Sequence, residues 1–209
     1  MNRRSLLLAS ALSALAATVP ALAQEGRQLT PEEIQLIRDI SEHNSVIRTM
    51  VGRFLQVDTE GQRIEGTFFL QRPDKIRFRY NPPSREEIIS VGRGFYVIDR
   101  KEMTQYAYPQ DRVPLREFLT DKIDLLSSNI VSYGQTDGYT TITLRDDTPI
   151  GTVDVSLIFD SESYDLVQWT LAEPNGSNLT FSLYDVEKNV EIPAAYFYID
   201  PTYKAVQPQ

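Results

Sequence analysis

The chain has 209 residues, with 21 Lys and Arg against 29 Asp and Glu, and a formal net charge of -8. An acidic surface is unfavourable for nucleic acid, which is therefore excluded as a partner. The sequence has no cysteine, so disulfides, thiol chemistry and cysteine-based metal sites are excluded. The length suits one domain with a substantial hydrophobic core, and we expect a monomer.

The first 23 residues have the pattern of a secretory signal peptide. Arg3 and Arg4 precede an apolar run over residues 6–19, and residues 21–23 (Ala-Leu-Ala) form a small-x-small cleavage site. The apolar run is shorter than the roughly 20 residues that cross a membrane. We expect a signal peptide over residues 1–23, exported by the Sec or the twin-arginine route, and a soluble exported domain over residues 24–209.

One amphipathic helix is expected near the start of this domain. Residues 30–33 (Thr-Pro-Glu-Glu) combine an N-cap threonine, a proline at the first helical position and a glutamate that completes a capping box. Apolar residues between Ile34 and Ile40 fall on one stripe, so the helix should end near His43.

From Val46 onward the apolar spacing changes to two, which predicts about ten antiparallel strands reaching Ile199. Helical spacing returns between residues 113 and 126, where we expect one or two short helices. Most strands alternate apolar and polar residues, so the sheet has one dry face. A large sheet of this kind curls into an open or closed barrel, and the helices are the natural cover for its mouth.

Residues 75–80 (Lys-Ile-Arg-Phe-Arg-Tyr) show this alternation clearly. Three apolar residues point to one face of the strand and three cations to the other, which we expect to be solvated. Catalytic groups are scarce: His43 is the lone histidine, and the acidic pairs at residues 86–87 and 146–147 are expected to lie at solvated strand ends. We therefore expect neither an enzyme nor a cofactor.

Arg72 ends an inward apolar row formed by residues 64, 66, 68 and 70. The plainer interpretation is that its head turns into water at the end of the strand. The alternative is that the buried guanidinium hydrogen-bonds to whatever covers the barrel mouth, since an unpaired buried charge would be costly.

Several stretches, in their order along the chain, resemble the LolA family of periplasmic lipoprotein carriers. They are residues 52–56 (Gly-Arg-Phe-Leu-Gln), residues 66–73 (Gly-Thr-Phe-Phe-Leu-Gln-Arg-Pro), residues 75–78, residues 95–99, Pro114, Asn189 and residues 192–201. The resemblance extends over nearly all of the expected exported domain.

The resemblance implies a mainly β (α+β) fold, with a single curved antiparallel sheet forming an unclosed barrel and helices as a lid over an apolar cavity. The cavity would hold the acyl chains of lipoproteins received from an inner-membrane LolCDE-type ABC exporter and passed to an outer-membrane acceptor. Arg72 matches a family arginine associated with hydrogen bonds that hold the lid shut. The expected lipid-cavity residues are Phe54, Ile64, Phe68, Leu70, Ile76, Phe78, Tyr80, Val155, Leu157 and Trp169. The expected lid residues are Arg72, Pro114, Leu115, Phe118 and Leu119.

Other functions fit the same fold. One is the lipoprotein-sensing domain of an envelope-stress regulator, and another is a carrier of a small lipid such as a glycolipid or isoprenoid. In a further alternative the barrel is filled by its own side chains and binds nothing. The sequence does not distinguish a filled barrel from an empty one.

Overall fold

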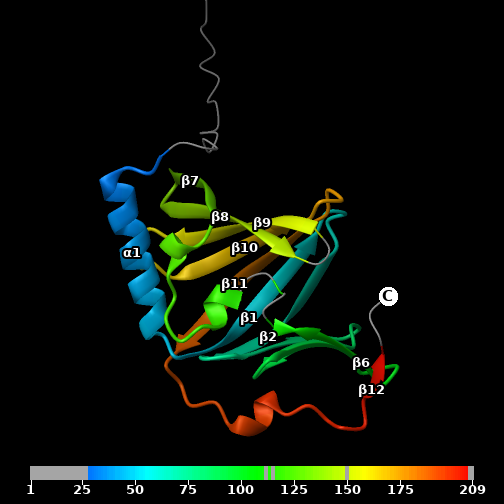
Figure 1. Ribbon diagram of the computed structural model, residues 1–209. Coiled ribbons are helices and arrows are strands. Elements are labelled where there is room, and N and C mark those ends of the chain that lie inside the picture. Colours follow the sequence, from blue (N-terminus) through cyan, green and yellow to red (C-terminus); the bar gives the residue numbers. More distant parts are fainter. Residues whose placement is uncertain (1–27, 111–112, 114–115, 149–150, 207–209) are drawn as a thin grey trace, which may run out of the picture.

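The computed structural model describes residues 28–110, 113, 116–148 and 151–206, and the expected signal peptide lies outside them. In this part of the chain, one helix packs against one sheet of 12 strands, shown in Figure 1. The strand order is β12-β6-β5-β4-β3-β2-β1-β11-β10-β9-β8-β7.

The helix α1 (Pro31–Val46) begins as its sequence predicts. The Thr30 backbone N–H donates to the Glu33 carboxylate at 2.8 Å, and the Glu33 N–H donates to the Thr30 hydroxyl at 3.3 Å. This capping box satisfies two backbone donors of the first turn. The helix ends three residues beyond the expected His43, where Ile47 takes an extended conformation and leads into the first strand.

The strands form two meanders that meet at β1. The first meander comprises β1 (Thr49–Asp58), β2 (Arg63–Gln71), β3 (Lys75–Tyr80), β4 (Glu86–Val91), β5 (Gly94–Asp99) and β6 (Thr104–Pro109). The second comprises β7 (Ile130–Thr136), β8 (Tyr139–Thr148), β9 (Gly151–Asp160), β10 (Leu166–Ala172) and β11 (Asn178–Lys188). Antiparallel pairing of β1 with β11 joins the two halves.

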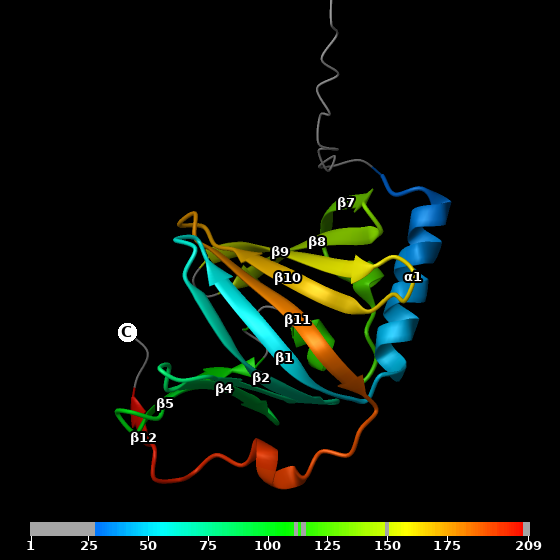
Figure 2. The same ribbon diagram turned by 180° about the vertical axis from the view of Figure 1, so that it is seen from behind.

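The connection between the meanders carries two short 3-10 helices, η2 (Arg116–Leu119) and η3 (Leu125–Ser127). We call residues 116–127 the lid. Figures 1 and 2 show the sheet curving around α1 and these short helices, with β7 and β12 at its two edges. The sheet is not closed, so the predicted mainly β, unclosed architecture is confirmed.

The C-terminal part of the sheet differs from the prediction. The strands were expected to continue to Ile199, but β11 ends at Lys188 and the chain continues through η4 (Ala194–Phe197) to a short β12 (Lys204–Val206). Pro193 has no N–H to donate to a ladder, which disfavours a strand there. β12 pairs with β6 in parallel, so the sheet is mixed and not wholly antiparallel.

The main core lies on the concave face, where it joins α1, the lid and both meanders. Gly66 shows how tightly it packs: a Cβ there would lie 2.3 Å from the Arg79 carbonyl oxygen and 2.5 Å from the Phe54 ring. The ring of Phe54 is fully buried. Glycine is therefore required beside this ring.

The outer face of β3 and β4 is partly covered: Arg79 is exposed, as expected for the cations of residues 75–80, but Arg77 is mostly buried, which was not expected. The C-terminal segment, residues 189–206, runs across it, and η4 packs on both strands (Figure 2). Arg77 donates to the Tyr196 carbonyl at 2.7 Å and to the Glu87 carboxylate at 3.0 Å. Glu87 is 1% exposed and also pairs with Arg79 and Arg100.

Within the described ranges, α1 and the shorter helices lack the combination of length and apolar character that a membrane crossing needs.

Candidate functional site: an apolar cavity beneath a lid

A cavity of about 230 Å³ lies between the concave face of the sheet and the lid. Most elements that border it contribute apolar side chains, because the inward positions of the alternating strands converge there, whereas α1 contributes Asn44. The lining residues are Asn44, Met50, Phe68, Leu70, Arg72, Ile76, Phe78, Ile88, Phe95, Val113, Phe118, Leu119, Leu166, Trp169, Leu171, Leu179, Phe181 and Leu183.

Aromatic rings form one wall of this cavity. Trp169 and Phe181 stack with centroids 4.9 Å apart and an interplanar angle of 14°, and Phe78 meets Trp169 edge-on at 5.9 Å. Phe54 lies behind this wall, in edge contact with Phe78 at 5.2 Å. Such ring pairs combine a large buried area with defined geometry, so the wall is stiff.

Arg72 connects the sheet to the lid. Its Nε donates to the Phe118 carbonyl oxygen at 2.9 Å, and a second guanidinium nitrogen donates to the Ile47 carbonyl oxygen. The residue is 6% exposed, and among the described residues no carboxylate pairs with it. Burial, with a smaller contribution from the Arg48 charge, lowers the pKa of Arg72 to about 10.

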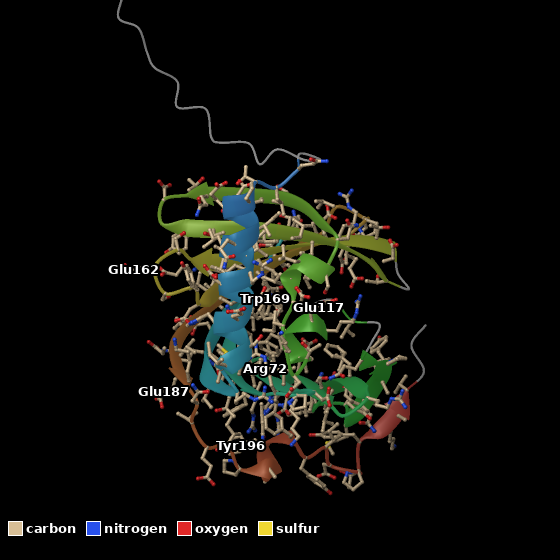
Figure 3. The ribbon with its side chains drawn as sticks, turned by 60° about the vertical axis from the view of Figure 1, so that its left-hand side comes forward. Arg72, Glu117, Glu162, Trp169, Glu187 and Tyr196 are labelled. Atoms are coloured by element: carbon tan, nitrogen blue, oxygen red, sulfur yellow. The ribbon has the colours of Figure 1, made fainter. Side chains whose placement is uncertain are left out.

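The guanidinium of Arg72 therefore does not turn into water, and the alternative interpretation of the sequence is the correct one. Its place beside the cavity, next to α1 and below Trp169, is visible in Figure 3. A backbone hydrogen bond of 2.8 Å from Asp74 N–H to the Leu119 carbonyl adds a second connection between the same turn and the lid.

The lid is also attached to α1. The backbone N–H of Ile123 donates to the Ser45 hydroxyl at 2.8 Å, and that of Leu125 donates to the Ser41 hydroxyl at 3.2 Å. Arg48, just after the helix, donates to the Asp121 carboxylate at 2.6 Å. Sequence reasoning missed these anchors, because serines in a helix interior and an exposed ion pair carry no distinctive pattern.

The structure brings together part of the expected site. Phe68, Leu70, Ile76, Phe78 and Trp169 line the cavity, as do the expected lid residues Arg72, Phe118 and Leu119. Pro114 and Leu115 lie outside the described residues.

Five expected cavity residues are not among those that line it. Phe54 and Tyr80 are buried behind the aromatic wall, and the Tyr80 hydroxyl donates to Gln56. Ile64 is partly buried against the core, while Val155 and Leu157 are buried within it. Alternation identified the face of the strand correctly, but it does not report how deep along the strand the cavity extends.

Several lining residues were missed, chiefly Leu166 and Leu171 of β10, the three of β11, and Asn44 of α1. The apolar period-two row at residues 179, 181 and 183 was a usable signal for β11. Asn44 gave no such signal. Its amide donates to the Ile40 and Tyr164 carbonyls at 2.8 Å each, which fixes a polar group at the cavity wall.

Several titratable groups outside the cavity form ion pairs or hydrogen bonds with one another. His43 contacts Asp165 at 2.7 Å, and Lys188 reaches the same carboxylate, so this cluster ties α1 to the β9–β10 turn and to β11. Asp146 accepts a hydrogen bond from Arg116 at 2.9 Å. Over the ranges that the structure describes, no cluster of three or more His, Asp or Glu has the arrangement of a metal site.

Comparison with known proteins agrees with this geometry. The family model described as "Outer membrane lipoprotein carrier protein LolA" matches residues 45–200. An outer-membrane lipoprotein carrier protein of Methylococcus capsulatus is 41% identical over 64 residues, which cover 27% of this chain and 31% of that relative's length. The match thus spans about a third of the relative.

Two solved structures share the fold at low sequence identity. An uncharacterized conserved protein from Thermus thermophilus gives a TM-score of 0.50 at 8% identity, covering 83% of this chain and 98% of that one. A DUF1329 family protein from Desulfovibrio piger gives a TM-score of 0.50 at 10% identity, covering 79% and 95%. Since the family model matches well over half of the residues, the chain belongs to the LolA family of outer membrane lipoprotein carrier proteins.

Proposed function

We propose that this protein is a periplasmic carrier that binds the acyl chains of lipoproteins in the cavity beneath the lid. The observation that carries the proposal is the cavity lining: among the described residues, Asn44 and Arg72 are its polar members and the others are apolar. A wall of this kind favours hydrocarbon, and burial of apolar surface contributes about 25 cal/mol per Å².

The cavity must enlarge to accept such cargo. Its volume of about 230 Å³ lies below the roughly 300–1,000 Å³ typical of pockets for drug-sized ligands, and a lipoprotein has more than one acyl chain. The lid is the movable wall, because it is short and irregular and forms no part of the sheet. It is held by hydrogen bonds from Arg72, Asp74, α1 and Arg48, by the Arg116–Asp146 pair and by the apolar side chains that it contributes to the core. We infer that cargo binding displaces it.

Lid closure favours the release of cargo. The bonds from Arg72 form when the lid is shut, and an occupied cavity holds the lid open, so closure favours the empty state. We expect the carrier to receive cargo from an inner-membrane LolCDE-type ABC exporter and to give it to an outer-membrane acceptor. Both transfers are possible only if the free energy of acyl-chain binding is partly offset by the free energy of lid closure. Neither catalysis nor a cofactor enters this proposal.

The experiment that tests the function is mass spectrometry of material co-purified with the protein. Cells that lack the outer-membrane acceptor should be used, so that cargo accumulates, and each sample should be measured before and after organic extraction. Acylated lipoproteins of many unrelated sequences are expected, because the cavity recognises the shared lipid. Free lipid alone would indicate a small-lipid carrier, one regulatory partner would indicate a sensor, and no bound material would contradict the proposal.

A further inference from the structure

A second cavity, of about 330 Å³, lies on the other side of the lid. It is bordered by η2, by the turn that follows η3, by the end of β8 and by Val155 of β9. Among the described residues, Phe118 lines both this cavity and the apolar one, and no other residue does. The two spaces therefore meet at one aromatic residue of the lid, which forms part of the wall of each.

The chemistry of the second cavity is different from that of the first. Its wall includes Arg116, Glu117, Ser128, Asn129 and Asp146, above an apolar floor. Glu117, on η2, is labelled in Figure 3. The apolar cavity can hold hydrocarbon, whereas this one offers hydrogen-bonding groups.

Most charges in this wall are already paired, either within the wall or with a neighbouring residue, and Asp147 accepts a hydrogen bond from the Thr152 hydroxyl at 2.8 Å. Arg116 donates to Asp146 at 2.9 Å and lies 3.5 Å from the Glu117 carboxylate. Arg145, also in the wall, donates twice to Asp154 at 2.7 Å. A ligand of this cavity therefore does not need to be charged.

Neutral polar groups remain available beside these pairs. Within the described chain, the Ser128 hydroxyl and the Asn129 carboxamide make no side-chain hydrogen bond. A polypeptide backbone offers one N–H donor and one C=O acceptor per residue, which hydroxyl and carboxamide groups can satisfy. The chemistry suits an uncharged, polar stretch of peptide.

We propose that the second cavity binds the first residues of the cargo polypeptide, directly after its acylated N-terminal residue. This inference rests on the proposed carrier function. With acyl chains on one side of Phe118, an extended peptide advances roughly 3.5 Å per residue, so the residues that follow the acylated one can pass the shared wall and enter the second cavity.

Phe118 links the cavity for the acyl chains to the cavity for the adjoining peptide. Its carbonyl oxygen accepts the bond from Arg72, and its ring stacks against Phe159 with centroids 6.3 Å apart. When the lid moves away from Arg72, the wall shared by the two cavities moves with it. Acyl chains and the adjoining peptide then enter one continuous space.

The test compares two probes by titration calorimetry of the purified protein. One is a triacylated cysteine peptide with four serine or asparagine residues after the cysteine, and the other is palmitate, which has no peptide. The variant Ser128→Trp fills the second cavity, and Asn129→Ala removes one of its polar groups without adding bulk. Ser132→Trp, on β7 and lining neither cavity, is the matched control.

Ser128→Trp should weaken binding of the triacylated peptide about tenfold, and Asn129→Ala severalfold, as expected for lost hydrogen bonds. Palmitate affinity should stay within about twofold in every variant, and Ser132→Trp should match the wild type with both probes. Unchanged peptide affinity in both variants, or an equal loss for palmitate, would overturn the second site while leaving the carrier function intact. Failure of the wild type to bind either probe would overturn both proposals.

Discussion

The Nε atom of Arg72, at the end of β2, lies 2.9 Å from the carbonyl oxygen of Phe118 in the lid. This bond joins residues that are 46 positions apart in sequence, and it links the strand that borders the cavity to the segment that covers it. Because both groups are buried, neither can exchange its partner for water while the lid is shut.

Replacing Arg72 by Leu should weaken lid closure by about 1–3 kcal/mol, the value of charge-assisted hydrogen bonds. The variant should bind a fluorescent acyl probe more tightly than the wild type and release it more slowly, because closure no longer opposes occupancy. Stopped-flow displacement measures both rates. Arg79→Leu, on the outer face, is the control. Release at the wild-type rate from Arg72→Leu would contradict the role given to this bond.

Ile76→Glu should abolish acyl binding and leave the fold intact. Ile76 lines the cavity and is only partly buried, so the carboxylate can remain hydrated in the empty protein but obstructs hydrocarbon. Thr67→Glu is the matched control. Thr67 is also partly buried, but it is the strand neighbour of the cavity-lining Phe68 and so belongs to the opposite face of the sheet. Equal loss of probe fluorescence in both variants would mean that binding does not occur in the cavity.

Glu87→Gln should destabilise the protein by several kcal/mol without altering acyl binding. Glu87 is surrounded by Arg77, Arg79 and Arg100, and removal of its charge leaves like charges facing one another under the C-terminal segment. Breaking a buried pair by removing one partner costs about 3–5 kcal/mol. Chemical denaturation measures this loss. An unchanged unfolding midpoint would show that the cluster is solvated and not covered.

Protonation of Asp165 at low pH should weaken the attachment of α1 to the sheet, because this carboxylate contacts both His43 of α1 and Lys188 of β11. Burial raises the pKa of this carboxyl, but the hydrogen bonds from Lys188 and His43 outweigh it, so the pKa is lowered from its ordinary value. The group therefore stabilises the fold above about pH 4, the unfolded-state value, and this stabilisation is lost as the pH falls through the lower folded-state pKa.

The check is the difference in melting temperature between the wild type and Asp165→Asn, followed from about pH 5 to about pH 3. The wild type should be the more stable at the upper end, and the difference should shrink towards the lower end. A difference that stays constant across this range would mean that the carboxylate charge does not contribute.

Much of the fold was predictable from local pattern. The capping box at Thr30 and Glu33 placed the start of α1, and period-two alternation gave the faces of the strands. The expectation that strands continue to Ile199 failed after Lys188, since Pro193 has no N–H to donate to a ladder and residues 194–197 form η4.

The site was less predictable, because it depends on how far the cavity extends along each strand and on contacts between residues that are far apart in sequence. Val155 and Phe68 both lie on inward positions, yet Phe68 lines the apolar cavity and Val155 does not. The cations of β3 looked like a solvated face, since the sequence gives no sign that Tyr196 would cover Arg77 from 119 positions away. Such contacts depend on how the complete chain folds and not on the local sequence pattern.

The pairing of β1 with β11 has a consequence for how the chain folds. Every other antiparallel contact in the sheet joins strands that are neighbours in sequence, so each meander can assemble from local hairpins. β1 and β11 must instead find each other across most of the domain, with Leu183 opposite Phe54. Because non-local pairing is slow, we expect it to form late. The apolar cavity, with walls from both meanders, arises in that same step, so partly folded chains have no binding space for hydrocarbon.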